Sequence, residues 1–425
     1  MKHVTGLRCV ICGKVYQPDE VLYVCPDHGN EGILDVEYDY DAIRAEIGEQ
    51  LPEASGGMFA YRPFLPIAEN VPAPPLVVGG TPLQEAPRLA QVAGVAELWL
   101  KDDGRNPTAS LKDRASAVAI MKAQELDAEI VTTASTGNAA AALAGLAASV
   151  GQKTVIFVPK SAPAAKIAQL LVYGATVLLV EGTYDDAFDL CLAATEKFGW
   201  YCRNTGYNPY MAEGKKTVTF ELYAQLMQQR TADAPPITHL FVSVGDGCII
   251  SGVYKGVRDL VATGYLAQMP KIIGVQAAGS AYLHDAWANG EDVLSKPPIA
   301  AHTVADSISA GLPRDRIKAM TAVRQTNGAF ITVTDEQILA AIPALAQGSG
   351  VFAEPASAAT YAGFLKAAQM GLIGPDARVA LILTGNGLKD VQSAMKSVGQ
   401  AVTIPAEITA VERFFLSDGL VKSKK

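Results

Sequence analysis

Lys101-Asp-Asp-Gly-Arg-Asn-Pro-Thr-Ala-Ser-Leu-Lys-Asp-Arg114 is the stretch from which the rest of the chain can be interpreted. It follows a short apolar run that is typical of a strand, and it precedes a run of small residues that predicts a helix. Asn106-Pro-Thr108 has the composition of a turn, and the hydroxyl of Thr108 or Ser110 can cap the following helix. The pattern therefore predicts strand, turn and helix, with Lys112 at the start of the helix.

The place of Lys112 matters for its chemistry. A helix N-terminus disfavours an ammonium group, and burial disfavours it as well. Both effects favour a neutral, nucleophilic amine of the kind that forms Schiff bases. The alternative is an ordinary surface lysine in the first turn of a helix. Asp113 and Arg114 follow it, either as a helix-surface pair that fixes the turn or in a direct role.

Three further stretches place hydroxyls and glycines directly after strand-like runs. They are Thr133-Ala-Ser-Thr-Gly-Asn138, Ser243-Val-Gly-Asp-Gly-Cys-Ile-Ile-Ser-Gly252 and Leu381-Ile-Leu-Thr-Gly-Asn-Gly-Leu-Lys-Asp390. In an α/β sheet the carboxyl ends of the strands are the usual place for a ligand. A lysine, a glycine turn that can cradle a phosphate and hydroxyls at strand ends together suit pyridoxal phosphate. Plain helix capping is the alternative for the first of the three.

These motifs resemble threonine synthase, a family of pyridoxal-phosphate enzymes of fold type II. The family pattern NPTGSFKDRG stands here as NPTASLKDRA, from Asn106 to Ala115. Its ASTGN, EPASAA and TGxGLKD patterns match Ala134–Asn138, Glu354–Ala359 and Thr384–Asp390. The resemblance extends from about Gly79 to about Asp390.

The resemblance implies an α/β fold with two doubly wound open-sheet lobes. The catalytic domain would span 79–425, with a smaller lobe of about 107–204 inserted and the cofactor between the lobes. The residue pattern agrees, because short β-branched runs alternate with alanine- and leucine-rich runs, as in parallel sheets. The strands expected beyond the central stretch are Ile130–Thr133, Thr154–Val158, Thr176–Val180, His239–Val244, Ile272–Gln276 and Val379–Leu383.

The resemblance also implies roles for individual residues. Lys112 would carry pyridoxal phosphate as a Schiff base, and Asn138 would donate to the phenolate oxygen of the cofactor. Ser135 and Thr136 would bind the substrate carboxylate, and Thr384 would bond to the pyridine nitrogen. Glu354 would either orient the site or cap the helix that follows it. The cofactor phosphate would be cradled by a loop of small residues: Gly245, Asp246, Gly247, Cys248 and Ile249.

Two departures from the family pattern concern the substrate. Ser309 and Met211 stand where the family often has arginine for the phosphate of O-phosphohomoserine, and neither can replace a guanidinium. Arg105 is our candidate replacement. Other candidates are Lys101, Lys160 and Arg314.

Three functions are therefore open. The first is a threonine-synthase-like lyase that converts O-phosphohomoserine and water into threonine and phosphate. The second is a sister enzyme, either cysteate-synthase-like on O-phosphoserine or a serine/threonine ammonia-lyase. The third is a catalytically silent binding protein, which the retention of Lys112, Asn138 and Thr384 argues against.

The N-terminal residues 1–40 contain a different motif. Cys9 and Cys12 form a Cys-x2-Cys pair, and Cys25 and His28 form a second pair at the same spacing. Three thiolates and one imidazole can bind a structural Zn²⁺ tetrahedrally. The alternative is a zinc-ribbon-like segment that has lost its metal. Residues 41–78 would connect this segment to the core and wrap around it.

Composition limits the remaining possibilities. The 425-residue chain is 49% hydrophobic and 18% charged, with a net charge of −8, which fits a soluble α/β enzyme. The short tail Lys422-Ser-Lys-Lys425 is the one basic run, so we expect no nucleic-acid partner. Without a long apolar stretch, we expect no membrane span. Six cysteines without a disulfide-like pattern predict a reducing cytoplasm. A homodimer acting on a small amino acid is expected from the resemblance.

Overall fold

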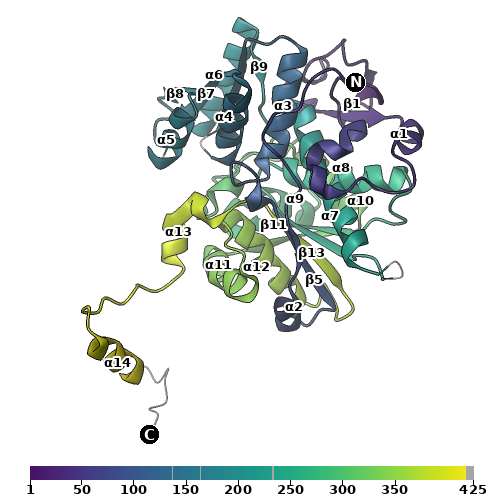
Figure 1. Ribbon diagram of the computed structural model, residues 1–425. Helices are drawn as coiled ribbons and strands as arrows, with labels where there is room; N and C mark the ends of the chain where they lie inside the picture. Colours follow the sequence, from purple (N-terminus) through teal and green to yellow (C-terminus); the bar gives the residue numbers. More distant parts are fainter. Residues whose placement is uncertain (136, 163, 232–233, 418–425) are drawn as a thin grey trace.

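Two lobes and a small N-terminal sheet make up the body of the protein in this computed structural model (Figure 1). The structure describes residues 1–135, 137–162, 164–231 and 234–417. Three sheets form within these residues. The two larger ones alternate with helices along the chain, so the predicted α/β architecture is confirmed.

The N-terminal sheet is antiparallel and has β1 at its centre, between β2 and β3. Its strands are β1 (Val4–Cys9), β2 (Val15–Tyr16) and β3 (Leu34–Tyr38). Helix α1 (Tyr40–Ile47) and the 3-10 segments η2 (Ala54–Gly56) and η3 (Met58–Phe64) lead to the core. Tyr61 and Phe64 of η3 pack their rings against Phe220, 5.4 and 4.6 Å between centroids, which ties this connector to the larger lobe.

The smaller lobe is a four-stranded parallel sheet in the order β8-β7-β6-β9, seen at the upper left of Figure 1. Its strands are β6 (Ile130–Ala134), β7 (Lys153–Pro159), β8 (Thr176–Val180) and β9 (Tyr201–Cys202). Its helices are α3 (Lys112–Glu125), α4 (Asn138–Val150), α5 (Ala164–Val172) and α6 (Tyr184–Phe198). Alanines fill the faces on which α3 and α4 meet, because small side chains let two helices approach closely.

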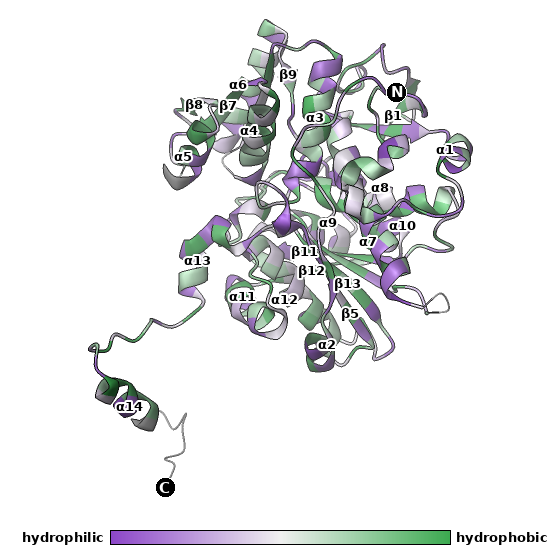
Figure 2. Cartoon of the chain, viewed as in Figure 1, coloured by the Kyte–Doolittle hydropathy of each residue, from purple (hydrophilic) through white to green (hydrophobic). Residues whose placement is uncertain are grey.

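The larger lobe is a six-stranded sheet in the order β12-β11-β10-β13-β5-β4, parallel except for β4, which pairs antiparallel with β5. Its strands are β4 (Leu83–Glu85), β5 (Glu97–Asp102), β10 (His239–Ser243), β11 (Lys271–Ala277), β12 (Ala329–Val333) and β13 (Arg378–Leu383). Figure 2 shows that its central strands are largely hydrophobic, as expected for a sheet with helices on both faces.

Helices cover this sheet, and among the described residues two further helices follow its last strand in the sequence. The covering helices are α2 (Pro87–Ala93), α7 (Tyr210–Gln229), α8 (Cys248–Ala262), α9 (Tyr282–Asn289), α10 (Arg316–Gln325), α11 (Asp335–Ser349) and α12 (Pro355–Gln369). The further 3-10 segments are η1 (Gly29–Glu31), η4 (Asp103–Arg105), η5 (Ala278–Ser280), η6 (Asp306–Ile308) and η7 (Gly387–Asp390). Helix α13 (Val391–Lys396) stays at the body, whereas α14 (Ile408–Ser417) stands apart from it in Figure 1.

The carboxyl ends of the strands bring the sequence motifs together. Leu111, just before α3, donates its backbone N–H to the carbonyl of Thr384, just after β13, over 2.8 Å. Ser110 and Gly385 form an isolated bridge beside this bond. The lysine-bearing stretch is therefore attached directly to the end of the strand that carries the Thr-Gly motif.

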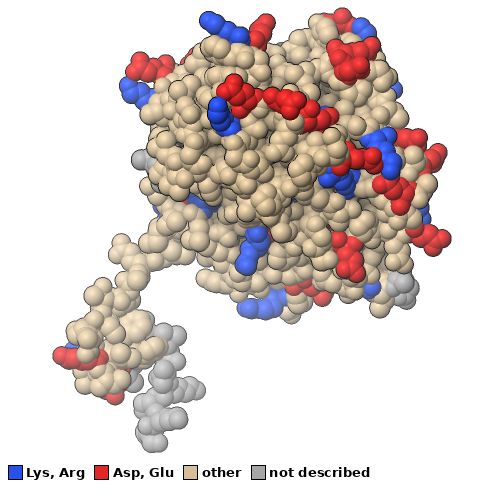
Figure 3. Space-filling view, turned by 45° about the horizontal axis from the view of Figure 1, so that its top comes forward, with Lys and Arg blue, Asp and Glu red and all other residues tan. Residues whose placement is uncertain are grey.

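Neither positive nor negative charge dominates the surface drawn in Figure 3. Acidic and basic side chains are interspersed over the face drawn in Figure 3, without a continuous basic patch. Among the described residues, no helix combines the length and apolar character that a membrane span requires.

Candidate active site

A cavity of about 920 Å³ lies between the two lobes, within the size range of small-molecule sites. The smaller lobe contributes Lys112, Ser135 and Asn138 to its lining. The larger lobe contributes the turn at 245–249 and Ser309. Four regions that the sequence singled out therefore line the same cavity. They are the start of α3, the start of α4, the turn before α8 and the loop that contains Ser309.

Lys112 is the first residue of α3, as the sequence predicted. Burial, together with the neighbouring cations Lys215 and Arg203, lowers the pKa of its amine to about 7. At neutral pH a large fraction of the amine is therefore unprotonated, which is the form that attacks a carbonyl carbon. The surface-lysine alternative does not describe this residue.

The turn before Lys112 is held by its neighbours in sequence. Asp113 accepts hydrogen bonds from the backbone N–H of Thr108, over 2.7 Å, and from its hydroxyl. Burial raises the pKa of Asp113 to about 6. Ala109 has φ of +65°, the left-handed region that disfavours residues with a Cβ, at the position where the family pattern has glycine. Asp113 and Arg114 are both fully buried, so of the two alternatives the helix-surface pair does not describe them, although Asp113 does hold the turn.

Asn138 is the first residue of α4 and contacts the other lobe. Its Nδ2 donates to both carboxylate oxygens of Glu354, over 3.1 and 2.9 Å. Glu354 precedes α12 without capping it through its side chain, and burial raises its pKa. Of the two roles considered for Glu354, the contacts favour orientation of Asn138. Ser135 lies beside the same helix start, whereas Thr136 lies outside the described residues.

The glycine turn at the start of α8 has the geometry of an anion cradle. Gly247 has φ of +91°, which favours glycine. A Cβ on Gly245 would lie 2.8 Å from the Cα of Ile308, so the turn packs tightly against the segment that ends at Ser309. The Asp246 carboxyl is turned to the backbone N–H of Arg314, over 3.4 Å. The first residues of α8 line the cavity, and the first N–H groups of a helix have no partner within the helix.

Thr384 is buried and does not line the cavity. Its Oγ1 lies 3.2 Å from Oγ of Ser357, which also accepts the N–H of Gly385 over 2.8 Å. The hydroxyl is thus held by neighbours just behind the cavity wall. Its role toward a pyridine nitrogen stays a prediction.

The candidate cations for a substrate phosphate are distributed unevenly. Arg105 is exposed and Met211 is fully buried, and neither lines the cavity. Lys101 is fully buried in ion pairs behind it, and Lys160 forms an exposed pair with Glu181. Arg314 alone of the four sequence-based candidates lines the cavity.

Among the cavity-lining cations that sequence reasoning missed, Arg203 and Lys215 are the most deeply buried. Each is 1% exposed, and neither has a carboxylate within ion-pair distance in the described part of the chain. Nη2 of Arg203 is buried without a hydrogen-bond partner there. Lys215 lies in α7, a helix that is buried on almost all sides. A charged residue in such a helix is rare unless it has a partner or a function, and this was the available signal.

Two cations of the cavity lining are paired across the two lobes. Lys166 of α5 forms an ion pair with Asp306 of η6. Arg314 forms one with Asp185 of α6, over 2.5 Å. These pairs compensate the charges at the rim, whereas Arg203 and Lys215 remain uncompensated inside.

Comparison with known proteins decides the family. The family model for "Pyridoxal-phosphate dependent enzyme" matches residues 75–385. The threonine synthase of Methanocaldococcus jannaschii is 36% identical over 409 residues, 96% of this chain and 98% of the relative. That of Methanosarcina acetivorans is 38% identical over 408 residues, 95% and 97% of the two chains. This chain belongs to the threonine synthase family.

Solved structures support the same fold. Threonine deaminase isoform 2 from Solanum lycopersicum has a TM-score of 0.61 at 22% identity, covering 80% of this chain and 84% of that one. Diaminopropionate ammonia lyase from Escherichia coli has a TM-score of 0.63 at 20% identity, covering 75% and 87%. At these identities the likeness concerns the fold. The predictions of fold type II, of a pyridoxal-phosphate-dependent lyase and of its cofactor are confirmed.

The residues present fit the cofactor that this family uses. Lys112 offers a largely neutral amine, and the α8 turn offers backbone N–H groups at a helix start. Lys215 and Arg203 add positive charge that has no counter-charge in the described protein. An aldehyde that carries a phosphate dianion matches both features.

The N-terminal segment brings its four predicted ligands together. The ligand atoms of Cys9, Cys12, Cys25 and His28 all lie within 4.8 Å of one another, a compact set of the composition that zinc prefers. The segment is fixed to the smaller lobe through Tyr23, whose hydroxyl accepts the N–H of Cys202 over 2.8 Å. Zinc binding itself stays a prediction.

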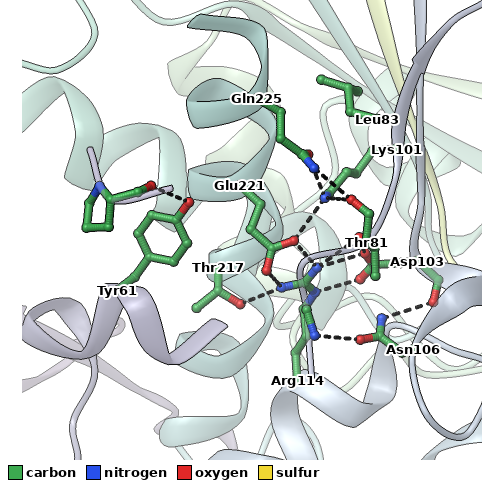
Figure 4. Close-up of polar contacts among 12 residues, drawn as sticks. Tyr61, Thr81, Leu83, Lys101, Asp103, Asn106, Arg114, Thr217, Glu221 and Gln225 are labelled. Atoms are coloured by element: carbon green, nitrogen blue, oxygen red, sulfur yellow. Dashed lines mark hydrogen bonds and ion pairs between the residues drawn. The ribbon is translucent and has the colours of Figure 1, made fainter. Parts of the chain in front are cut away.

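A second set of buried charges lies behind the cavity and is fully paired (Figure 4). Arg114 contacts Asp103 at 2.6 Å and Glu221 at 2.6 Å, and Lys101 contacts Glu221 at 2.9 Å. These two cations and two carboxylates are all fully buried. They join β5, η4, α3 and α7 and leave no charge without a partner.

Proposed function

We propose that this enzyme is a threonine synthase that converts O-phosphohomoserine and water into threonine and inorganic phosphate. The observation that carries the proposal is the uncompensated positive charge inside the cavity. One phosphate of the cofactor and one of the substrate together would match Arg203, Lys215 and the helix starts. The relatives named threonine synthase, which match nearly the whole chain, support the same conclusion.

The residues of the chain would divide the work of the reaction. The bound cofactor supplies an electron sink for carbanion chemistry. Lys112 would move protons at the α and β carbons of the substrate. Its pKa of about 7 lets the amine both accept and donate a proton at neutral pH. Ser135, together with Thr136, would bind the substrate carboxylate at the start of α4. Glu354 would hold Asn138, and one N–H of this amide would turn to the cofactor oxygen.

Arg203 is the strongest candidate for the substrate phosphate. It is buried in the cavity wall, its Nε donates to Ser116 over 3.2 Å, and its Nη2 has no hydrogen-bond partner in the described protein. Its free donor is therefore available to a second anion, in the role that Ser309 and Met211 cannot fill. Arg105, the candidate from the sequence, would have to move toward the cavity from its exposed position.

A sister enzyme is the second candidate. The absence of a guanidinium at Ser309, which lines the cavity, favours a substrate other than the usual one of the family. O-Phosphoserine with sulfite as co-substrate, or serine and threonine in a deamination, are then the reactions to consider. The silent binding protein is disfavoured by the low pKa of Lys112.

One experiment separates these functions. The purified holoenzyme is offered O-phosphohomoserine, O-phosphoserine with sulfite, threonine and serine separately, and products and released phosphate are identified. Threonine and phosphate in equal amounts from O-phosphohomoserine support the proposal, and Lys112→Ala serves as the inactive control. Deamination of threonine or serine without any threonine formation would instead establish the sister enzyme.

The role of Arg203 is tested on the same assay. Losing a charge-assisted hydrogen bond to the substrate typically costs about 1.5–3 kcal/mol, so Arg203→Met should lower kcat/KM by roughly ten- to more than a hundredfold. Arg105→Ala serves as the comparison, and a larger effect there would return the role to Arg105. We further propose that the enzyme is cytoplasmic and that it is a homodimer. Size measurement in solution tests the oligomeric state.

A further inference from the structure

Lys215 is a buried cation to which the proposed reaction assigns no individual partner. Its ammonium lies 3.5 Å from the Thr205 hydroxyl and also hydrogen-bonds the thiol of Cys248. Neither group carries a compensating negative charge, because burial raises the pKa of Cys248. An isolated buried ammonium is strongly unfavourable, so its retention here calls for an anion that the protein itself does not supply.

The packing of α7 against α8 fixes where this ammonium is. A Cβ on Gly252 would lie 2.8 Å from the Cβ of Lys215, so the lysine stem leaves α7 directly beside the fifth residue of α8. The head of the side chain reaches Cys248, the first residue of α8. The ammonium therefore lies next to the start of α8, on the cavity side.

Positive charge accumulates at this point from two sources. The N-terminus of a 15-residue helix carries a partial positive charge and free N–H groups, and Lys215 adds a full charge beside it. The side chain of Asp246, the nearest carboxyl in the turn, is bonded to the backbone of Arg314. Without a bound anion, helix end and ammonium repel each other, whereas a phosphate dianion interacts favourably with both.

We propose that Lys215 is a direct ligand of the cofactor phosphate, which it shares with the N–H groups at the start of α8. The turn itself offers no cationic side chain, because its residues are Gly245, Asp246, Gly247, Cys248 and Ile249. A lysine from the neighbouring helix supplies a charged donor. The assignment rests on the cofactor of the family and is independent of which substrate is turned over.

The test compares two forms of the cofactor that differ only in the phosphate. Apoenzyme of wild type and of Lys215→Met is titrated with pyridoxal phosphate and with pyridoxal, and binding is followed by absorbance at pH 9, where Lys112 is neutral in both proteins. Loss of a charge-assisted hydrogen bond should weaken pyridoxal phosphate binding by about ten- to a hundredfold. Pyridoxal, which has no phosphate, should bind both proteins equally. Lys215→Arg should restore most of the affinity for the phosphorylated form.

Two results would overturn the assignment. Equal weakening for pyridoxal and pyridoxal phosphate would mean that Lys215 maintains the shape of the cavity. Unchanged cofactor affinity with a raised KM for a phosphorylated substrate would assign Lys215 to the substrate. Failure of the enzyme to make threonine would leave the cofactor titration intact, so the two proposals fail separately. Lys215→Gln, which keeps a polar donor without charge, replaces Lys215→Met if that variant does not fold.

Discussion

Two groups of buried charges lie close together in sequence and behave in opposite ways. Lys112 and Arg114 are two positions apart in α3, and Lys215 and Lys216 are adjacent in α7. Arg114 and Lys216 are held by carboxylates, with Lys216 2.5 Å from Glu213. Lys112 and Lys215 face the cavity without such partners in the described protein.

We infer that the difference separates charges that stabilise the fold from charges that are available to bind a ligand. In the set around Arg114, the cations lower the pKa of Glu221 to about 2 despite its burial, so the carboxylate stays ionised and paired. In the cavity, burial and like charges lower the pKa of Lys112 instead. Pairing is therefore a better guide to function here than burial or residue type.

The largest effect is expected from removing the amine that faces the cavity. Lys112→Ala should lower turnover by at least about a thousandfold, since proton transfer by a placed side chain contributes about 10²–10⁴-fold and the point of cofactor attachment is lost as well. Borohydride reduction of wild type followed by peptide mapping should place the label on Lys112. A label on another lysine would contradict the assignment.

The paired set should respond in stability rather than in chemistry. Arg114→Met leaves Asp103 and Glu221 with too little positive charge, and breaking a buried pair costs about 3–5 kcal/mol of unfolding free energy. Denaturant unfolding of the cofactor-free proteins measures this. The matched control is Lys112→Met, which removes an unpaired charge and should leave stability unchanged or raise it. Equal losses in both variants would contradict the distinction between the two sets.

The cysteine cluster contrasts with the cavity in the sign of its charges. The cavity contains cations without ion-pair partners among the described residues, whereas the cysteines bind a metal as negatively charged thiolates. Protein purified without added metal should contain close to one zinc per chain, and Cys25→Ser should lower that content strongly. Elemental analysis under reducing conditions measures both, with Cys191→Ser as the control outside the cluster. Absence of metal from wild type would establish the ribbon as metal-free.

The smallest expected effect is a shift in pH dependence. Only the neutral amine of Lys112 attacks the cofactor carbonyl, so the rate of cofactor capture by apoenzyme should rise with pH around a midpoint near 7 and then level off. Lys215 lowers that pKa, so Lys215→Met should move the midpoint upward. Stopped-flow absorbance at a series of pH values measures the rate. An unchanged midpoint would mean that the two cations do not interact.

The same pKa affects stability of the apoenzyme. The folded pKa of Lys112 lies near 7, whereas an unfolded lysine titrates near 10.4. Between these values the unfolded chain binds more protons, so unfolding free energy should rise with pH across this window. In Lys112→Met this dependence should be absent.

Much of the fold could be predicted from the sequence because it depends on local pattern. The expected strand at Ile130–Thr133 is β6, and Lys112 begins α3 as the turn composition predicted. Strand β12 (Ala329–Val333) was missed, although at five residues it is as long as the predicted β6. The antiparallel pairing of β4 with β5 could not be foreseen, since it depends on contacts distant in sequence.

The site was predictable only where a motif carries it. Lys112 and the turn before α8 were found through their patterns. Arg203 and Lys215 were not, because the sequence does not reveal whether a cation will meet a carboxylate once the chain is folded. Arg105 shows the reverse case, since its place near the lysine motif suggested a role, yet its side chain is exposed outside the cavity.

The ion pairs at the rim connect the entry of substrate to the salt concentration of the solution. Lys166 with Asp306, and Arg314 with Asp185, each join one lobe to the other, and both carboxylates are largely exposed. Dissolved ions weaken such pairs over a range of about 8 Å at physiological ionic strength, while the buried pairs around Arg114 are shielded from them. We therefore expect added salt to weaken the rim pairs and to leave the buried pairs of the interior largely unchanged.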